Sequence, residues 1–453
     1  MSSLILWIVC AAVGAEAGAA AERSAAETAA QRGYRWLTTK TYLPPDFDQE
    51  VFDELWKAWE EPLRSQAEKA SPDERRKMAF SRYGLTEAPD RPGGVALQYV
   101  DDGHSGWVMN CLACHGGKVA GRVIAGLPNS LYALETLTDD VRATKLRLRK
   151  PLSHMDLGGA GMPLGTTIGT TNAVMFGVVL LNYRDADLNV HRNRLPPKLT
   201  HHDHDAPPFW NVKRKHSLYA DGGVLKSHRA LMQFLLLPKN GPDQFRQWEN
   251  DYRDVLAWIE SLEPPQYPFA VDRALAARGQ GLFEKNCSEC HGTYGPRGSY
   301  PEINVPIDEV GTDRARHDAI PAEWRTAYGA TWFGHYGEKA VKADLAGYVA
   351  PPLDGIWATA PYLHNGSVPT LWHLFHPNER PIVWTRTEDG YDQQRVGLEI
   401  ESLAEVPADA RRGARRRRYF DTREFGKSAA GHLFPDVLDE AEKQAVIEYL
   451  KTL

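Results

Sequence analysis

The sequence predicts a mainly α-helical protein, built from two similar modules with long loop insertions and few short strands. Three observations support this fold class. A Cys-x-x-Cys-His motif occurs twice, each half of the chain ends in a long segment of helical periodicity, and a proline-rich stretch separates the halves. The chain of 453 residues is long enough for two or three domains that each bury a hydrophobic core.

The N-terminus has the features of an export signal. Leu4–Val13 is an apolar run of suitable length, and Ala15–Ala17 fits an A-x-A cleavage site. Met1–Ser3 lacks the usual basic residue, and the apolar run is too short to cross a bilayer. We expect residues 1–20 to be a cleaved signal peptide rather than a retained anchor. The mature chain is then expected to be periplasmic or secreted, without a membrane span.

The overall charge gives no sign of a nucleic-acid partner. The net charge is −6, with 25% charged residues and no general excess of basic side chains. The run Arg411–Arg418 is the local exception. We interpret it as a solvated loop, with a docking site for an acidic electron-transfer partner as the alternative.

Two cysteine motifs carry the chemistry. Cys111–His115 and Cys287–His291 share the Cys-x-x-Cys-His spacing, and a glycine follows each motif. This spacing is typical of c-type haem attachment, in which two thiols on one turn bond the porphyrin and the next histidine binds the iron. A redox dithiol, half of a zinc site or a disulfide would leave both histidines unexplained. We therefore expect two covalent haems, attached through Cys111, Cys114, Cys287 and Cys290 and ligated by His115 and His291.

The segments before the linker divide into two parts. Residues 21–94 are expected to form a helical N-terminal extension, and residues 95–263 a first haem module. Asp243–Leu262 has apolar residues at helical spacing and predicts a helix at the end of this module. The proline-rich residues 264–268 stop that helix and form a stiff linker.

Residues 269–453 are expected to form a second haem module. Helical patterns cover Ala274–Asn286, directly before the second motif, and Leu438–Leu453 at the end of the chain. A helix before the haem that crosses a helix at the end of the module closes the pocket of a cytochrome c. We therefore expect cytochrome c-like modules.

The second haem has a restricted choice of sixth ligand. All seven methionines precede the second motif, so a His/Met haem built within this module is excluded. The sixth ligand is a histidine or is absent. The candidate histidines are His317, His335, His364, His373, His376 and His432. His432 follows a glycine in a loop before the last helix, from which its side chain can reach back over the haem.

The sixth ligand of the first haem stays open. The candidates are His154, Met155, Met162, His201, His202, His204, His216 and His228. The cluster His201–Asp205 has the residue types of a metal site. Consecutive residues rarely converge on one ion, however, so we interpret this cluster as a solvated polar loop.

Several blocks of the sequence resemble the bacterial di-haem cytochrome c peroxidase superfamily. Ala360–Leu371 (APYLHNGSVPTL) resembles a motif of that superfamily, and the chain is most similar to the branch that contains the rubber oxygenases. Other blocks that fit this branch are Gly161–Thr167, Pro207–Asn211 with Lys213 and Lys215, Asp221-Gly222, Pro351–Trp357 and Ala430–His432. The blocks cover most of residues 95–453 and are specific for the superfamily rather than for a substrate.

The resemblance implies roles for individual residues. His432 matches the second axial ligand of the C-terminal haem, which would make the pair His291/His432. Phe209 and Trp210 match an aromatic pair in the pocket where an N-terminal haem without a protein sixth ligand meets O₂ or peroxide, and plain core packing is the alternative. His364 would support loops or a propionate. A calcium ion between the domains is known in the peroxidase relatives, but the sequence assigns no ligands to it.

Haems of different ligation suggest a division of labour. A six-coordinate haem passes electrons, whereas a five-coordinate one can activate peroxide or O₂. We favour a peroxidase-like oxidoreductase that receives electrons from a donor protein such as a small cytochrome or cupredoxin. Glu135, His201 and His204 are candidates for its acid–base residue. The alternatives are a non-catalytic di-haem electron-transfer cytochrome and a rubber oxygenase-like dioxygenase on an apolar substrate. The chain is much shorter than the rubber oxygenases, so the substrate stays open.

Overall fold

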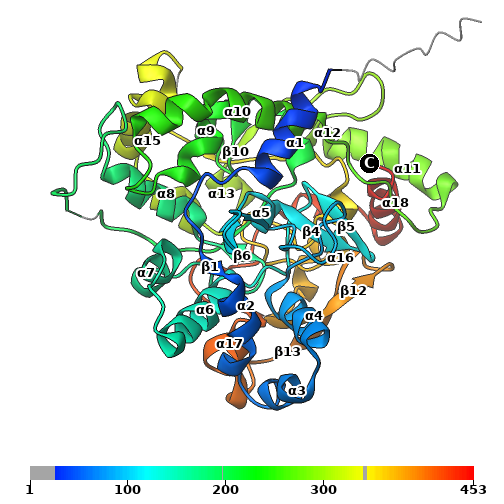
Figure 1. Cartoon of the computed structure of the whole chain (residues 1–453). Helices are drawn as coiled ribbons and strands as arrows, with labels where there is room; N and C mark the ends of the chain where they lie inside the picture. The colour runs from blue at the N-terminus through cyan, green and yellow to red at the C-terminus, as the bar shows by residue number, and fades with distance from the viewer. Residues whose placement is uncertain (1–25, 196, 340–343) are drawn as a thin grey trace, which may run out of the picture.

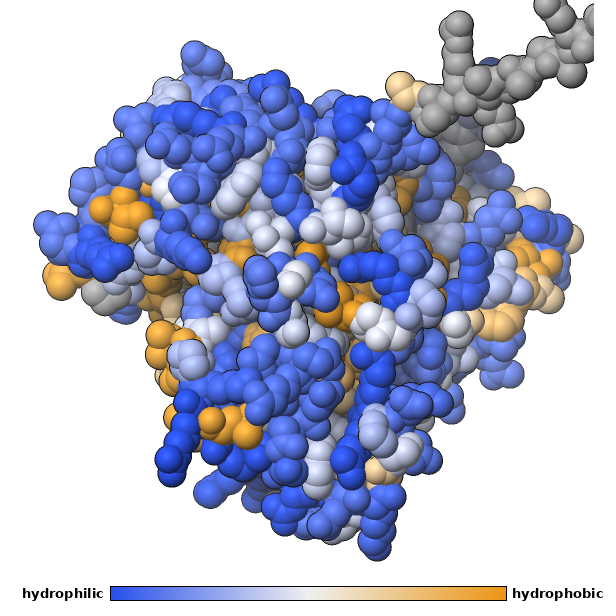
Figure 2. All heavy atoms as spheres, viewed as in Figure 1, coloured by the Kyte–Doolittle hydropathy of each residue, from blue (hydrophilic) through white to orange (hydrophobic). Residues whose placement is uncertain are grey.

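The described chain is mainly helical with few short strands, as predicted (Figure 1). The computed structural model describes residues 26–195, 197–339 and 344–453. The predicted signal peptide, residues 1–20, lies outside the described residues. Within these ranges, every helix is too short or too polar to serve as a membrane span. The face of the molecule in Figure 2 is mostly hydrophilic, with small and separate apolar patches.

The helices and strands fall into three stretches of the chain. Before the first motif lie α1 (Ala29–Thr39), β1 (Phe47–Asp48), α2 (Gln49–Glu54), α3 (Leu63–Lys69), α4 (Pro72–Tyr83), β2 (Tyr99–Asp101) and β3 (Gly106–Met109). From the first motif to the linker follow α5 (Leu112–His115), β4 (Gly116–Val119), β5 (Arg122–Ala125), α6 (Leu134–Leu148), α7 (His154–Gly161), β6 (Thr170–Thr171), α8 (Ala173–Asn182), β7 (His204–Asp205), β8 (Ser217–Leu218), β9 (Val224–Leu225), α9 (His228–Leu231) and α10 (Pro242–Ser261).

The third stretch contains the second motif. Its elements are α11 (Arg273–Asn286), α12 (Ser288–His291), β10 (Asn304–Pro306), α13 (Ile307–Val310), α14 (Ala315–Ala319), α15 (Ala322–Gly329), β11 (Gly347–Val349), α16 (Leu371–Phe375), β12 (Val383–Asp392), β13 (Gly397–Leu403), α17 (Gly413–Arg416), β14 (Tyr419–Asp421) and α18 (Glu440–Leu450). Short 3-10 helices are η1 (Leu55–Ala58), η2 (Phe209–Arg214), η3 (Met232–Leu235), η4 (Trp332–Gly337), η5 (Ile356–Ala358), η6 (Pro377–Glu379), η7 (Ala408–Ala410) and η8 (Phe434–Val437).

Two helices close the second module, and both were predicted. Asp272 caps the start of α11, and Asp439 and Glu442 form a capping box at the start of α18. The helices touch at Gly279, where a Cβ atom would lie 1.8 Å from the carbonyl oxygen of Ala445. Because only glycine lacks that atom, it alone permits this approach. Figure 1 shows α11 and α18 side by side at the right of the molecule.

The first module contains a similar helix pair, which was not expected from the sequence. α10 confirms the predicted helix to within one residue at each end, and α1 packs across it (Figure 1). At the contact, a Cβ atom on Gly33 would lie 2.0 Å from the carbonyl oxygen of Asp254. Arg32 forms an ion pair with the Asp254 side chain at 2.8 Å. Although α1 lies in the predicted N-terminal extension, it therefore packs as part of the first module. The domain boundaries stay a prediction.

The strands form small antiparallel sheets, and the core continues across the linker. The largest sheets have the orders β1-β3-β2 and β13-β12-β14. Leu127 and Trp210 of the first module belong to the same hydrophobic cluster as Phe283 and Trp357 of the second. The two predicted modules therefore share a buried interface.

The arginine-rich run is only partly a solvated loop. It contains the single turn α17, and Arg417 pairs with Asp139 of α6 at 2.6 Å. Arg416 pairs with Glu424. Arg411 stays exposed, as predicted.

Candidate di-haem site

One large cavity connects the two motifs. Its volume is about 1080 Å³, and its wall includes Cys111, Cys114, His115, Cys287, Cys290 and His291. Each histidine ends a one-turn helix, α5 or α12, so the thiols and the imidazole of a motif emerge within one turn. The four cysteines are free thiols rather than disulfides. A cavity above the usual range for one ligand, about 300–1,000 Å³, has room for more than one group.

The two motif histidines are held in the same way. The Nδ1 atom of His115 bonds to the carbonyl oxygen of Pro207 at 3.0 Å, and that of His291 to the carbonyl oxygen of Pro351 at 2.9 Å. Because a carbonyl can only accept, the proton lies on Nδ1, and Nε2 keeps the lone pair that binds iron. Burial lowers the pKa of both imidazoles, that of His115 to about 4, so they are neutral at pH 7. Both histidines fit the role of proximal haem ligand.

His432 lies near His291 on the wall of the same cavity. The two ring centroids are 6.2 Å apart. Two metal–nitrogen bonds of about 2 Å each, plus two ring radii, give nearly this separation. Burial, followed by the nearby His291, lowers the pKa of His432 to about 3 and keeps its imidazole neutral. The pair therefore fits one iron ion between two imidazoles.

The backbone at His432 is unusual for a residue with a side chain. Its φ is +51°, in the left-handed region that costs about 1–3 kcal/mol outside glycine. The backbone N–H of His432 donates to the carbonyl oxygen of Val310 at 2.7 Å, which fixes the loop against α13. A strained histidine held beside a second imidazole indicates a functional position.

Few of the residues predicted as possible sixth ligands of the two haems line the cavity. Among the histidines considered for the second haem, His364 and His432 line the cavity. Among the candidates for the first haem, His154, Met155 and His204 line it. The ring stacked on His115 is that of Phe209, and no described imidazole pairs with His115 as His432 does with His291.

Phe209 packs against the first motif. Its ring stacks on the imidazole of His115, with ring centroids 3.8 Å apart and an angle of 19° between the planes. The backbone N–H of Phe209 donates to the carbonyl oxygen of Gly126, which follows β5. This position fixes the orientation of the imidazole. A catalytic role for Phe209 stays a prediction.

Trp210 and Asn211 connect the first motif to the second. Trp210 is 1% exposed, and its indole N–H donates to the carbonyl oxygen of Asp354 at 2.7 Å. The Asn211 amide donates to the carbonyl oxygen of Pro352 at 2.7 Å. Pro352 directly follows Pro351, which holds His291. Helix η2 therefore links the surroundings of both motif histidines, and the predicted role of Trp210 in catalysis stays untested.

The prediction of a solvated loop at His201–Asp205 is wrong for its central residues. His202, Asp203 and His204 are buried. The hydroxyl groups of Thr166 and Thr170 donate to Asp203 at 2.6 and 2.8 Å. These polar side chains point inward because β7 pairs with β6 and their partners lie there. Within the described ranges, no group of three or more His, Cys, Asp or Glu side chains is arranged to hold a metal ion, and no calcium ligands are assigned.

Several polar residues on the cavity wall had no predicted functional role. They include Asp205, Lys215, Tyr219 and Arg316. Burial raises the pKa of Asp205 well above its usual range and so favours the protonated form of its carboxyl group. The predicted acid–base candidate Glu135 instead accepts from the backbone N–H of Leu164 at 2.6 Å, outside the cavity wall. Asp205 ends the cluster His201–Asp205, which the sequence predicted as a solvated loop, and its place on the cavity wall depends on the packing of distant segments.

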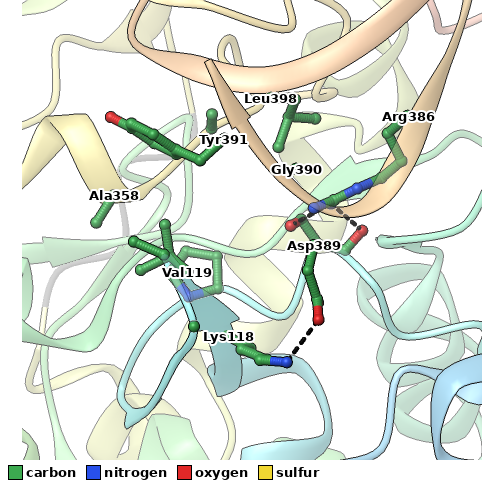
Figure 3. A pocket seen from close by; sticks show the side chains of 13 residues that line it. Lys118, Val119, Ala358, Arg386, Asp389, Gly390, Tyr391 and Leu398 are labelled. Atoms are coloured by element: carbon green, nitrogen blue, oxygen red, sulfur yellow. Dashed lines mark hydrogen bonds and ion pairs between the residues drawn. The ribbon is translucent and has the colours of Figure 1, made fainter. Parts of the chain in front are cut away.

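A second, much smaller pocket lies where β4 and β5 meet β12 (Figure 3). Lys118 pairs with Asp389 across it at 2.6 Å, and Arg386 donates to the hydroxyl of Ser130 at 2.7 Å. No residue of either motif lines this pocket. It is a polar junction between the modules rather than part of the haem site.

Residues 347–385 match the family described as RoxA-like, cytochrome c-like. This segment of the second predicted module is thus similar to RoxA-like cytochromes. The matched segment includes the block Ala360–Leu371, which carried the predicted resemblance, and it includes His364 on the cavity wall. This RoxA-like similarity supports a haem cofactor and a redox function of the cytochrome type.

Two proteins of Sinorhizobium fredii are also similar to this chain. The uncharacterized protein y4iM is 29% identical over 55% of this chain and 64% of its own length. The uncharacterized protein y4iJ is 30% identical over 42% of this chain and 41% of its own length. The chain therefore spans less than two thirds of each relative. A crystal structure of a MauG-like protein associated with microbial copper homeostasis shares 16% identity over 62% of this chain and 89% of its own, with a TM-score of 0.29.

Proposed function

We propose that this chain is an exported di-haem c-type cytochrome oxidoreductase. Peroxide or O₂ is activated at the first motif, and electrons reach it through the second. The observation that carries the proposal is the unequal surroundings of the motif histidines. His291 has an imidazole 6.2 Å away, whereas the ring packed on His115 is that of Phe209. One haem is thus expected to be closed by two histidines, and the other to keep a position for a small molecule.

A haem with an open coordination position supplies the redox chemistry, and the chain's own residues prepare the site. The carbonyl of Pro207 holds the Nδ1 proton of His115 and so fixes the lone pair on Nε2. Apolar side chains of α8 line the cavity and exclude water. Asp205 lies on the same wall, and because its pKa is raised its carboxyl group can hold a proton and deliver it to a reacting oxygen. Trp210, buried between the motifs, is the proposed bridge for electrons.

Replacing His432 with glycine tests the two ligation states. Because φ is +51° at this position, glycine fits the backbone without strain. We expect the reduced wild-type protein to bind one carbon monoxide per chain, and His432→Gly to bind two. Absorption spectra of reduced protein titrated with carbon monoxide measure the stoichiometry. Added imidazole is expected to restore the low-spin spectrum of the variant.

The control is His376→Gly, because His376 bonds to Glu440 and does not line the cavity. Unchanged stoichiometry in His432→Gly would show that His432 is not a ligand. Wild-type protein that binds no carbon monoxide and does not respond to peroxide would exclude the enzyme proposal. That result would favour the non-catalytic electron-transfer cytochrome.

The apolar wall of the cavity favours one further candidate, O₂ chemistry on an apolar substrate. Val174, Phe176 and Leu180 of α8 line the wall, as they would for a hydrocarbon chain. Oxygen uptake with an oligoisoprenoid, in the absence of peroxide, would support this rubber oxygenase-like function. Peroxide-dependent oxidation of a reduced donor protein would support the peroxidase.

An exposed apolar face beside His432 is the proposed docking surface for the electron donor. Leu433, Phe434 and Val437 are 55%, 41% and 73% exposed, and the Phe434 ring lies 5.4 Å from that of His432. The carboxylate Asp436 lies among them in η8. An apolar face with a carboxylate suits a small cytochrome or cupredoxin whose own apolar face is rimmed by lysines.

Val437→Lys is expected to lower the second-order rate of electron transfer from such a donor by about tenfold, which corresponds to about 1.4 kcal/mol. The new positive charge must be desolvated against the apolar face of the partner, and it repels the lysines around that face. Stopped-flow measurement at several ionic strengths gives the wild-type rate, which should fall as salt rises. Leu195→Lys, at an 85% exposed position far away in the sequence, is the matched control. Equal effects of both variants would place the docking surface elsewhere.

A further inference from the structure

A buried charge cluster at the edge of the cavity holds two guanidinium groups against one carboxylate. Arg316 and Arg325 both bond to one oxygen of Asp221, at 2.8 and 3.3 Å. Asp221 and Arg316 are 1% and 3% exposed. Burial acts to raise the pKa of Asp221, but the two guanidinium groups outweigh it and hold that pKa below its usual range. Two permanent cations therefore share one carboxylate.

Arg316 has donor capacity that no described side chain uses. Its Nη1 atom is buried and has no hydrogen-bond partner among the described residues. Arg316 lines the cavity, whereas Arg325 does not. A buried guanidinium donor without an acceptor is costly, and a carboxylate is the acceptor that a planar guanidinium fits best.

Lys215 adds a second cation to the same wall. Its Nζ atom donates to the carbonyl oxygen of Tyr219, but only at 3.3 Å. Glu302, the nearby carboxylate, already accepts from the backbone N–H groups of His216 and Ser217 at 2.7 and 2.9 Å. Burial lowers the pKa of Lys215, as expected for an ammonium group without a close carboxylate.

The surplus charge lies beside the second motif. The Tyr219 ring lies 5.6 Å from the Arg316 guanidinium. The next residue, Ala220, belongs to the same hydrophobic cluster as Cys290 and Tyr348. An anion bound by Arg316 would thus lie close to the group attached at Cys287 and Cys290.

We propose that Arg316, assisted by Lys215, binds the propionate carboxylates of the haem attached to the second motif. This inference rests on the proposed haem binding and adds to it the residues that neutralise the cofactor's acidic edge. A haem brings two carboxylates, which match two cations on the wall. The same chemistry would suit a soluble carboxylate substrate, and the experiment separates the two sources.

The test compares Arg316→Met with Arg325→Met in the holoprotein. Both variants remove one guanidinium from Asp221, but only the first removes a group from the cavity wall. A cation near the haem favours the reduced state, so Arg316→Met is expected to shift the reduction equilibrium of the low-spin haem about tenfold, or 59 mV in the negative direction. Spectroelectrochemistry gives the potential, and the propionate bending bands in resonance Raman spectra are expected to shift. Arg325→Met should change both much less.

Arg316→Lys provides a second test that can be used even if Arg316→Met does not fold. Lysine keeps the positive charge but lacks the planar guanidinium group that forms two parallel hydrogen bonds. The reduction potential of the low-spin haem should therefore stay at the wild-type value, whereas the propionate bending bands should shift. Equal shifts in Arg316→Met and Arg325→Met, or unchanged bands in Arg316→Lys, would overturn the inference. So would a spectrum of wild-type protein that responds to added succinate, since a free carboxylate could then reach the site. The number of haems per chain is measured separately for the wild type and for every variant, and two are expected. A wild-type protein without covalent haem would refute the proposed function rather than this inference.

Discussion

Replacing Cys111 and Cys114 with serine is expected to remove one of two covalent haems and to abolish the reaction with peroxide or O₂. Serine cannot form the thioether bonds that retain the porphyrin, and His115 alone is a weak anchor. Haem staining on a denaturing gel and the pyridine haemochrome spectrum should show half of the wild-type haem per chain. Carbon monoxide binding should disappear together with the first haem.

The reciprocal change at Cys287 and Cys290 supplies the control. It should also halve the haem content, but it should keep carbon monoxide binding and remove the low-spin spectrum that we assign to the His291/His432 pair. Wild-type protein from a host able to mature c-type cytochromes must carry both haems. A bare polypeptide from such a host would refute the function proposed for this chain.

Asp205→Asn is expected to lower peroxide turnover by about 100- to 10,000-fold, the usual range for loss of a general acid or base. The amide keeps the shape of the carboxyl but has no proton to deliver. Because burial raises the pKa of Asp205, the acid form persists to a higher pH than in an exposed carboxyl group and is lost as the pH rises through that raised pKa. Wild-type turnover should therefore fall on the alkaline side, and the variant should lack this decline.

Steady-state rates across the pH range measure both effects of Asp205→Asn. Glu135→Gln is the control, since Glu135 does not line the cavity and bonds to the backbone N–H of Leu164. A retained alkaline decline in Asp205→Asn, or an equal loss in Glu135→Gln, would assign the proton donor to another residue. His204 would then be the next candidate on the cavity wall, although burial keeps its imidazole neutral.

The features that the sequence predicted correctly are those that depend on residues close together in the chain. The helix periodicity before the second motif gave α11 to within one residue, and the periodicity at the end of the chain gave α18 to within two residues at its start and three at its end. By contrast, the role of α1 depends on the contact between Gly33 and Asp254, more than two hundred residues apart, and no local pattern contains it. Distance along the chain thus limits what periodicity can predict.

The same limit applies to the candidate site. Haem attachment depends on the spacing of two cysteines and one histidine within five consecutive residues, so both attachment motifs could be predicted from the sequence. The burial of His202 and Asp203 could not, because polar residues in a row usually indicate a solvated loop. Arg316 belongs to no motif, and Asp205 belongs to a cluster that was predicted as a solvated loop, so both became candidates only through their place on the cavity wall.

The short helix η2 has a consequence for any attempt to separate the halves of this protein. Its first turn lies on the His115 imidazole, while Trp210 and Asn211 bond to carbonyl groups of the loop that anchors His291. Cleavage at the proline-rich linker would therefore leave each fragment with severed hydrogen bonds and exposed tryptophan surface. The two halves should melt in a single cooperative transition, and neither fragment should fold when it is expressed alone.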